Sequence, residues 1–259
     1  VTVGGNLIAT TDANSGVINL GTLAVDGTVQ LTTNGSGNAT VVNDAGLNFH
    51  ASTVGGNLVA TATTGNISDN SSHANAVAGT SSFTTSQNNA DIYLDNANAF
   101  TGAVSLNTTG STGNALVDNG TTALNIAASS VGGRLTLTSG NSITDSGTVT
   151  VGYGGLVATT DANNGAINLG TLAVDGTITL VTNGSGNATV VNDAGLNFAA
   201  STVGGNLAAT ATTGNMTDSG ALAITGTTTL TTSANDATIA LDTTTNAFTG
   251  AVTITTNDS

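Results

Sequence analysis

The chain has 259 residues, a formal net charge of −14 and only 6% charged residues, with 35 Gly and no Pro, Cys or Trp. Arg134 is the only basic residue, so nucleic-acid partners are excluded, because nothing neutralises phosphate groups. The 38% of apolar residues alternate regularly with polar ones, which argues against disorder. The chain has no run of about 18 apolar residues, so no transmembrane helix is expected.

A long internal repeat organises the chain. Residues 9–69 reappear as residues 158–218 at an offset of 149, with 52 identities in 61 positions. One of the nine differences is His50, which stands opposite Ala199. Sequence repeats of this kind are typical of solenoids and other repeat architectures.

A shorter motif, Gly-x-apolar-x-apolar, recurs inside the long repeat. Its glycines are spaced by about 21–24 residues in most cases and by about 29–31 residues in three, and such a period is typical of solenoids. We therefore expect about eleven coils, three of them longer. The motif begins, with weaker members included, at Gly5, Gly27, Gly56, Gly79, Gly102, Gly133, Gly154, Gly176, Gly205, Gly226 and Gly250.

Each coil divides into short alternating segments. In the first coil they are residues 6–10, 17–21 and 22–26, separated by turn-forming residues 11–16, and the corner TNGSGNAT follows at Thr33 and again at Thr182. Alternation over four to six residues, bounded by Gly, Asn and Asp, predicts strands and turns. Three short strands in each coil predict an all-β fold, a right-handed parallel β-helix (β-solenoid).

The predicted solenoid is a single continuous unit over residues 1–259. Each strand pairs in parallel with its equivalent one coil away, about 4.8 Å along the axis. Val, Ile, Leu and Ala point into a core expected to be too narrow for large aromatic side chains. Asn6, Asn57 and Asn206 stand at equivalent corners and are expected to stack along the axis. Tandem β-sandwich domains are the alternative, but these strands are short and very regular.

Two stretches carry a family resemblance. Val54–Asp69 (VGGNLVATATTGNISD) and Ser219–Thr232 (SGALAITGTTTLTT) resemble repeats of filamentous-haemagglutinin-like exoproteins, the adhesins of two-partner secretion. The resemblance implies a β-helical rod that is secreted or at the bacterial cell surface, with roles in adhesion, extracellular filaments or biofilm. The NPNG-type signature of that family's secretion domain is absent, so an interior stalk segment is expected.

The resemblance also suggests partners. We expect surface glycans or proteins of a host or neighbouring cell. Neither end of the chain shows a polar capping element, so head-to-tail self-association is expected as well.

Catalysis is not expected from these residues. Asp91 and Asp95 flank Tyr93, and paired carboxylates can hydrolyse glycosidic bonds. The alternative function is therefore a polysaccharide-active β-helix enzyme that uses Asp carboxylates. Proton abstraction, however, needs a base and cationic groups, and the chain offers one Arg and two His.

The Asp residues at corners recur in both copies of the long repeat. Asp12, Asp26, Asp161 and Asp175 are the candidates for binding Ca²⁺, which prefers carboxylate and carbonyl oxygens. The other interpretation is that these residues and Asp69 cap their own turns through the side chain. No Ca²⁺-binding GGxGxD or DxDxDG motif occurs, and no cofactor is expected.

The remaining polar features are expected at the surface. His50 and His73 are interpreted as isolated surface residues, with no second His at ligand spacing, and Arg134 is expected to point to solvent from a corner. Asn-x-Ser/Thr sequons make glycosylation sites conceivable at Asn34, Asn38, Asn183 and Asn187, although chance explains them in a chain so rich in Asn, Ser and Thr.

Overall fold

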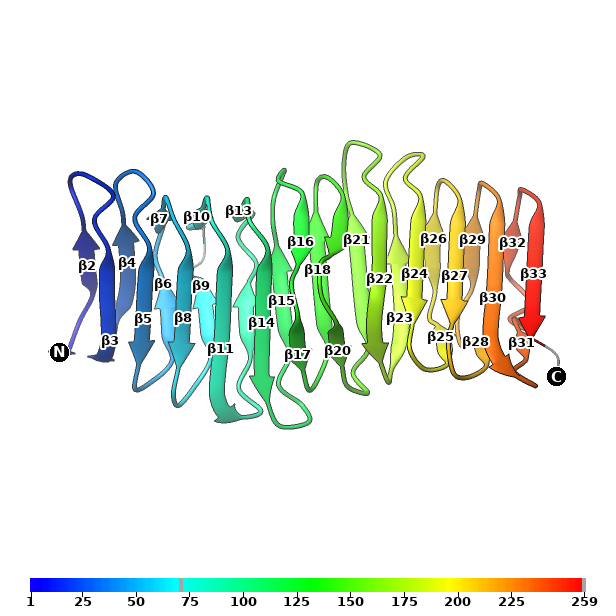
Figure 1. The fold of residues 1–259 in the computed structure, drawn as a ribbon, viewed down its shortest axis with the longest axis horizontal. Helices are drawn as coiled ribbons and strands as arrows, with labels where there is room; N and C mark the ends of the chain where they lie inside the picture. Colours follow the sequence, from blue (N-terminus) through cyan, green and yellow to red (C-terminus); the bar gives the residue numbers. More distant parts are fainter. Residues whose placement is uncertain (70–71, 258–259) are drawn as a thin grey trace.

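The computed structural model describes residues 1–69 and 72–257. These residues form 33 strands and no helix, and the chain winds as a β-solenoid of about 12 turns (Figure 1). Every strand pairing in the described residues is parallel, as the sequence predicts; Ala39 to Asn43, for example, lie in register beside Leu58 to Ala62. No helix long and apolar enough to cross a membrane is found in the described part of the chain.

The strands form two sheets, one on each side of the rod. Sheet I has fifteen strands: β1 (Thr2–Val3), β3 (Ile18–Val25), β5 (Ala39–Asn43), β8 (Leu58–Ala62), β11 (Ser81–Asn88), β14 (Val104–Thr109), β16 (Leu124–Ile126), β17 (Ser129–Val131), β19 (Ile143–Asp145), β20 (Val149–Val151), β22 (Ile167–Val174), β24 (Ala188–Asn192), β27 (Leu207–Ala211), β30 (Thr228–Asn235) and β33 (Val252–Asn257).

Sheet II has eighteen strands, most of them shorter. They are β2 (Leu7–Thr10), β4 (Thr28–Thr32), β6 (Leu47–Phe49), β7 (Thr53–Val54), β9 (Ile67–Asp69), β10 (Ala76–Val77), β12 (Ile92–Leu94), β13 (Ala99–Phe100), β15 (Ala115–Asp118), β18 (Leu135–Ser139), β21 (Leu156–Thr160), β23 (Thr177–Val181), β25 (Leu196–Phe198), β26 (Ser201–Val203), β28 (Met216–Asp218), β29 (Leu222–Ile224), β31 (Ile239–Ala240) and β32 (Ala247–Phe248).

Each turn passes once through each sheet. Most turns hold three strands, as predicted, because one side of the turn bends and splits into a pair such as β6 and β7. The other turns hold two strands; β2 and β3 make up one of them. In Figure 1 the chain crosses from sheet II to sheet I at the upper corners and from sheet I to sheet II at the lower corners.

The turns are more uniform in length than the motif spacings predict. Residues paired across neighbouring turns are 19 apart at the shortest, as in Ala39 and Leu58, and 25 apart at the longest, as in Ile67 and Ile92. The prediction of three longer coils is therefore wrong.

The long spacings arise because the Gly motif changes sheets. Gly27 directly precedes β4 in sheet II, whereas Gly56 precedes β8 in sheet I, so the interval between them is about one and a half turns. The same change of sheet accounts for the intervals from Gly102 to Gly133 and from Gly176 to Gly205. The motif marks a strand that starts after a tight corner, in whichever sheet that corner opens.

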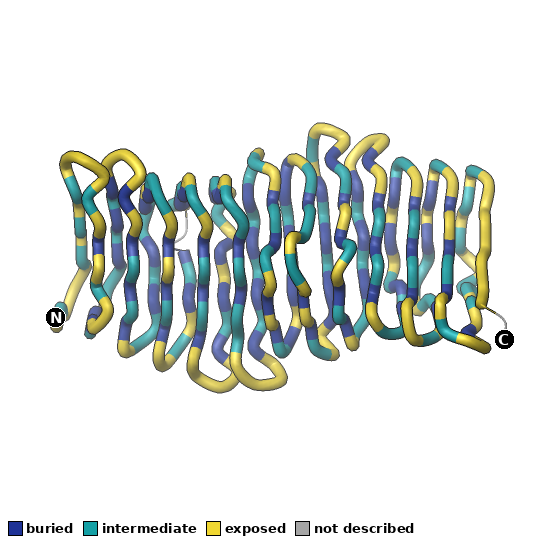
Figure 2. Tube along the Cα trace, viewed as in Figure 1, coloured by how far each residue is buried: buried dark blue, intermediate teal, exposed yellow. Residues whose placement is uncertain are grey.

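One apolar core runs along the axis. Inward residues alternate with outward ones, as in β8, where Leu58, Ala60 and Ala62 are buried and the residues between them are not (Figure 2). Burial of these aliphatic side chains supplies the main favourable free energy of folding.

The expectation that large aromatics would not fit is wrong. Phe49, Phe83, Phe100 and Phe198 are among the largest fully buried side chains. The rings of Phe83 and Phe100 have centroids 5.5 Å apart. Small neighbours make the room, since Phe83 lies in register beside Ala60.

Side chains at the corners connect neighbouring turns. Asn57 Oδ1 accepts the Thr80 N–H at 2.9 Å, and Asn206 Oδ1 accepts the Thr227 N–H at 2.8 Å, both at upper corners. The expected equivalence with Asn6 is wrong, because Asn6 lies at a lower corner, where its Oδ1 accepts the Thr28 N–H at 2.9 Å. Arg134 takes the corner Asn position, is exposed as predicted, and donates its backbone N–H to Asn114 Oδ1 at 2.8 Å.

Some corners bring backbone directly against backbone. A Cβ atom on Gly55 would overlap the carbonyl oxygen of Gly35 in the preceding turn, and Gly204 stands in the same relation to Gly184. These positions require glycine because neither backbone can move aside without breaking the ladder.

We therefore expect Gly55→Ala to lower the free energy of unfolding by about 1–3 kcal/mol or more, as overpacking against rigid atoms does. The matched control is Gly21→Ala, because the nearest atom to a Cβ there, Asn19 Oδ1, is 3.8 Å away. Urea denaturation of both variants measures the difference. Equal stability of the two variants would show that the corner can relax.

Candidate functional site

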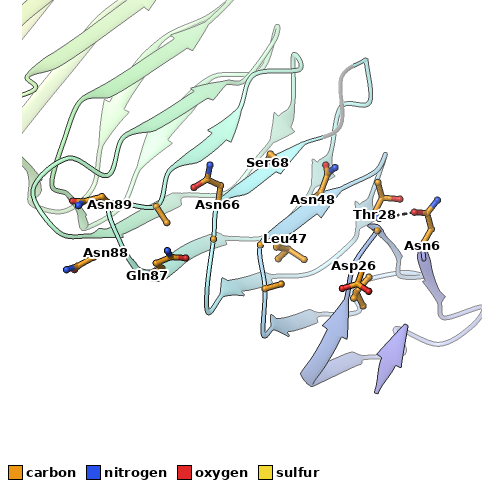
Figure 3. A pocket seen from close by; sticks show the side chains of 16 residues that line it. Asn6, Asp26, Thr28, Leu47, Asn48, Asn66, Ser68, Gln87, Asn88 and Asn89 are labelled. Atoms are coloured by element: carbon orange, nitrogen blue, oxygen red, sulfur yellow. Dashed lines mark hydrogen bonds between the residues drawn. The ribbon is translucent and has the colours of Figure 1, made fainter. Parts of the chain in front are cut away.

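A polar groove runs along the lower corners of the first four turns. It has a volume of about 610 Å³. Figure 3 shows the side chains that line it. Its lining comes from Asn6 and from four successive corners, at residues 25–28, 45–48, 65–68 and 87–90. Residues far apart in sequence thus share one surface because the turns stack.

Differences in corner length create the hollow. β5 ends at Asn43 and β6 begins at Leu47, so this corner is short, whereas β11 extends to Asn88 and reaches lower than β5 and β8 in Figure 1. Buried Asn43 keeps the short corner tight: its Nδ2 donates to the Gly46 carbonyl at 2.7 Å and to the Val25 carbonyl at 3.0 Å. Asn192 makes the equivalent contacts in the second copy of the long repeat.

The groove is lined by amides and hydroxyls. Asp26 carries the only charge in it, and no basic side chain lines it. The Oδ1 atom of Asn48 is buried and has no hydrogen-bond partner among the described residues. Amide groups both donate and accept hydrogen bonds, so this lining suits a ligand rich in neutral hydroxyl groups. The polar lining residues are Asn6, Asp26, Thr28, Asn48, Asn66, Ser68, Gln87, Asn88 and Asn89.

A second groove of about 400 Å³ lies seven turns further along the rod. Asp175, Asn197 and Asn215 occupy the places of Asp26, Asn48 and Asn66, and the Asn197 Oδ1 atom likewise lacks a partner among the described residues. Tyr153, which is 88% exposed, lines this groove from the corner between β20 and β21. The two grooves therefore share three floor positions and differ in their walls: Tyr153 borders the second groove, whereas Asn6 and residues 87–90 border the first.

The four Asp candidates for Ca²⁺ are exposed. Asp12 lies in an upper corner between β2 and β3, whereas Asp26 lies in a lower corner between β3 and β4, and Asp161 and Asp175 repeat this separation. No group of three or more His, Cys, Asp or Glu side chains is found in residues 1–69 and 72–257. The structure thus places these Asp residues singly, and Ca²⁺ binding there stays a prediction.

Asp69 has a structural role that the sequence interpretation missed. Its carboxylate accepts the backbone N–H groups of Asp95 and Asn96 at 3.1 and 3.3 Å and the Asn98 Nδ2–H at 2.8 Å. Burial raises the pKa of this carboxyl group above 3.8, although the three hydrogen bonds act in the opposite direction. The interpretation of Asp69 as a cap on its own turn is therefore wrong, because the Asp69 carboxylate accepts hydrogen bonds from the bend of the next turn.

Asp218 has the same role in the second copy of the long repeat. Its carboxylate accepts the backbone N–H of Asp242 and the Asn246 Nδ2–H.

Asp91 and Asp95 do not form a free carboxylate pair. Asp91 Oδ1 accepts the backbone N–H of Asn114 at 2.7 Å, and Asp91 Oδ2 accepts the Tyr93 hydroxyl at 3.2 Å. Burial, together with the nearby Asp91 charge, raises the pKa of Tyr93. The Asp91 carboxylate is thus engaged in contacts between and within turns. Whether the chain has enzymatic activity stays a prediction.

The four sequon residues fall into two classes. Asn34 and Asn183 are exposed in upper corners, and no side-chain hydrogen bond of theirs is found among the described residues. Asn38 and Asn187 instead accept the backbone N–H groups of Asn57 and Asn206, both at 2.8 Å. Glycosylation stays a prediction, and the geometry favours the first pair over the second.

The two histidines are not isolated. The rings of His50 and His73 stack with centroids 3.9 Å apart. The sequence contained a signal for this contact, because the residues are 23 apart and so are the motif glycines Gly56 and Gly79. A separation of one turn places residues side by side.

The comparisons with known proteins identify repeats only. A family model described as repeats of unknown function (DUF5649) matches residues 36–107, 112–169 and 185–255, which is well over half of the chain. The first match begins at residue 36 and the third at residue 185, and this separation equals the offset of the long repeat. No curated protein and no solved structure matches the chain.

The Asp69 contacts lead to a stability prediction. We expect Asp69→Ala to lower the free energy of unfolding by about 1–3 kcal/mol, because buried donors lose their acceptor. Asp26→Ala, at an exposed corner, should change it by less than about 0.5 kcal/mol. Urea denaturation gives both values, and hydrogen exchange should show faster opening at the amides of residues 95 and 96. Unchanged exchange there would contradict the assigned role.

Proposed function

The chain belongs to the DUF5649 family of repeats of unknown function, and we propose that it serves as a rigid rod segment of a large exported bacterial surface protein. In this role it is part of a stalk or an extracellular filament. The function is structural and adhesive.

The observation that carries the proposal is the unbroken pairing of turns. Sheet I pairs from β1 to β33, and the core stays apolar over the same length. About 12 turns at about 4.8 Å each give a rod roughly 60 Å long. Each turn contacts only its neighbours, so more repeats lengthen the rod without changing its design.

Composition supports an exported location. The chain has no Cys, so it does not depend on the redox state of its compartment, and a net charge of −14 favours solubility. The resemblance of residues 54–69 and 219–232 to filamentous-haemagglutinin-like repeats points the same way. The rod would hold a binding tip away from the cell or build a fibre by head-to-tail association.

The adhesive part of the proposal concerns the two polar grooves. Their amide and hydroxyl lining suits neutral sugar hydroxyls, and the lack of basic groups disfavours acidic sugars. Exposed Tyr153 offers the second groove an aromatic face on which a sugar ring can pack. A glycan lying along the rod could contact both grooves and gain from bivalent binding.

Electron microscopy of the native cell surface tests the rod. An antibody raised against this chain should label straight rods that are thin and much longer than one chain. Labelling at regular intervals along continuous fibres would identify a filament subunit, and labelling on anchored single rods would identify a stalk. Labelling confined to the cytoplasm or to globular particles would overturn the proposal.

A glycan array followed by calorimetry tests the grooves. We expect binding to neutral glycans and none to glycans rich in uronic acids. The double variant Asn48→Ala, Asn197→Ala should bind about tenfold more weakly or worse, because each lost hydrogen bond is worth about 0.5–1.5 kcal/mol. Asn34→Ala, at an exposed upper corner, is the control and should bind normally. Preference for acidic glycans, or equal binding by all variants, would contradict the assignment.

A further inference from the structure

The only two histidines of the chain lie next to each other on the rod. His50 follows β6 and His73 precedes β10, so both occupy the bend of sheet II in consecutive turns. Their ring centroids are 3.9 Å apart and the ring planes are inclined by 34°. Both side chains are half-buried, which limits the directions in which the rings can turn.

The backbone around the pair is fixed from several sides. The His50 N–H donates to the Val29 carbonyl at 2.9 Å, and the Ser52 hydroxyl donates to the His50 carbonyl at 3.1 Å. Close to His73, the buried side chain of Asn75 accepts the Ser52 N–H at 3.0 Å. The two rings are therefore held near each other by contacts that do not involve the rings themselves.

The second copy of the long repeat lacks both histidines. Ala199 replaces His50, and the register of β26 with β29 puts Gly220 at the place of His73. A Cβ atom on Gly220 would overlap the backbone nitrogen of Ala200, so no side chain fits there. The first copy therefore has room for two side chains at this bend, whereas the second copy has room for only one.

We propose that His50 and His73 form a binding site for a divalent transition-metal ion of the Cu²⁺, Ni²⁺ or Zn²⁺ class. Imidazole nitrogen is a preferred ligand of these ions. Two nitrogens bound to one ion at about 2.0–2.1 Å lie no more than about 4.2 Å apart. The ring centroids are 3.9 Å apart, so rotation about the side-chain bonds can bring one nitrogen of each ring within this distance. Each imidazole has two nitrogens, so one can bind the ion while the other keeps a hydrogen bond.

The residues around the histidine pair determine the remaining ligands of the ion and which ions can bind. Since no third His, Cys, Asp or Glu joins the pair among the described residues, water fills the remaining coordination positions. The net charge of −14 raises the local concentration of cations around the rod. Copper should bind most tightly, following the general affinity order of divalent ions, and Mg²⁺ and Ca²⁺ should not compete because they prefer oxygen ligands.

Isothermal titration with Cu²⁺, Ni²⁺ and Zn²⁺ tests the proposal on the chain without a polyhistidine tag. We expect one ion per chain and retention in excess Mg²⁺. His50→Ala and His73→Ala should each weaken binding by at least about tenfold, since even the loss of an outer-shell contact costs about 10–100-fold. His50→Ala introduces the residue that the second copy carries at this position, so the fold should tolerate it.

The matched control is Ala199→His, which adds a histidine in the second copy without a partner. It should leave the stoichiometry at one ion per chain. Thermal unfolding gives a separate readout, because Zn²⁺ should raise the melting temperature of the native chain and not that of the double variant lacking both histidines. Equal metal affinity of the native chain and that double variant would overturn the proposal, as would a second site in Ala199→His.

Discussion

The constraint on which this structure depends is the pairing of each turn with the turns on either side. Every strand must present its backbone to two neighbours, so the rod has room for small corners and no room for Pro in a paired position. At Gly55 the backbone of the preceding turn lies so close that the corner admits no side chain. At Asn57 the same requirement is met by a side chain that accepts a backbone N–H from the next turn. The lack of Pro and the many Gly and Asn residues at corners follow from this one condition.

The sequence predicts the solenoid because alternation and corner residues are local signals. It does not predict to which sheet a strand belongs, since that depends on counting turns through long-range pairing. Gly27 and Gly56 carry the same motif and precede strands of opposite sheets, which made one and a half turns look like a single long coil. The buried Phe83 was unexpected for a related reason: the space for its ring comes from Ala60 in the neighbouring turn, not from nearby sequence.

Contacts at the candidate sites depend on exact turn length, which the sequence gives only to within a few residues. Asp69 reaches the backbone of residues 95 and 96, and a change of one residue in the intervening turn would point a different side chain at that bend. The first groove depends on residues still further apart in the sequence, because its lining comes from corners of four successive turns. His50 and His73 were within reach of sequence reasoning, since their separation equals one turn, but only once the turn is known to be regular there.

The two copies of the long repeat separate what the rod needs from what its surface can vary. The floor of the groove is kept in both, from Asp26 to Asn66 and from Asp175 to Asn215, because these corners also hold the turns together. Core differences between the copies keep the side chain apolar, as in Val29 against Ile178. His50 against Ala199 changes a side chain at a bend. A side chain at a bend can therefore change without cost to the pairing, whereas a corner glycine cannot. On such a scaffold, new binding properties should arise first at bends and groove walls, because a substitution there leaves both neighbouring turns in register.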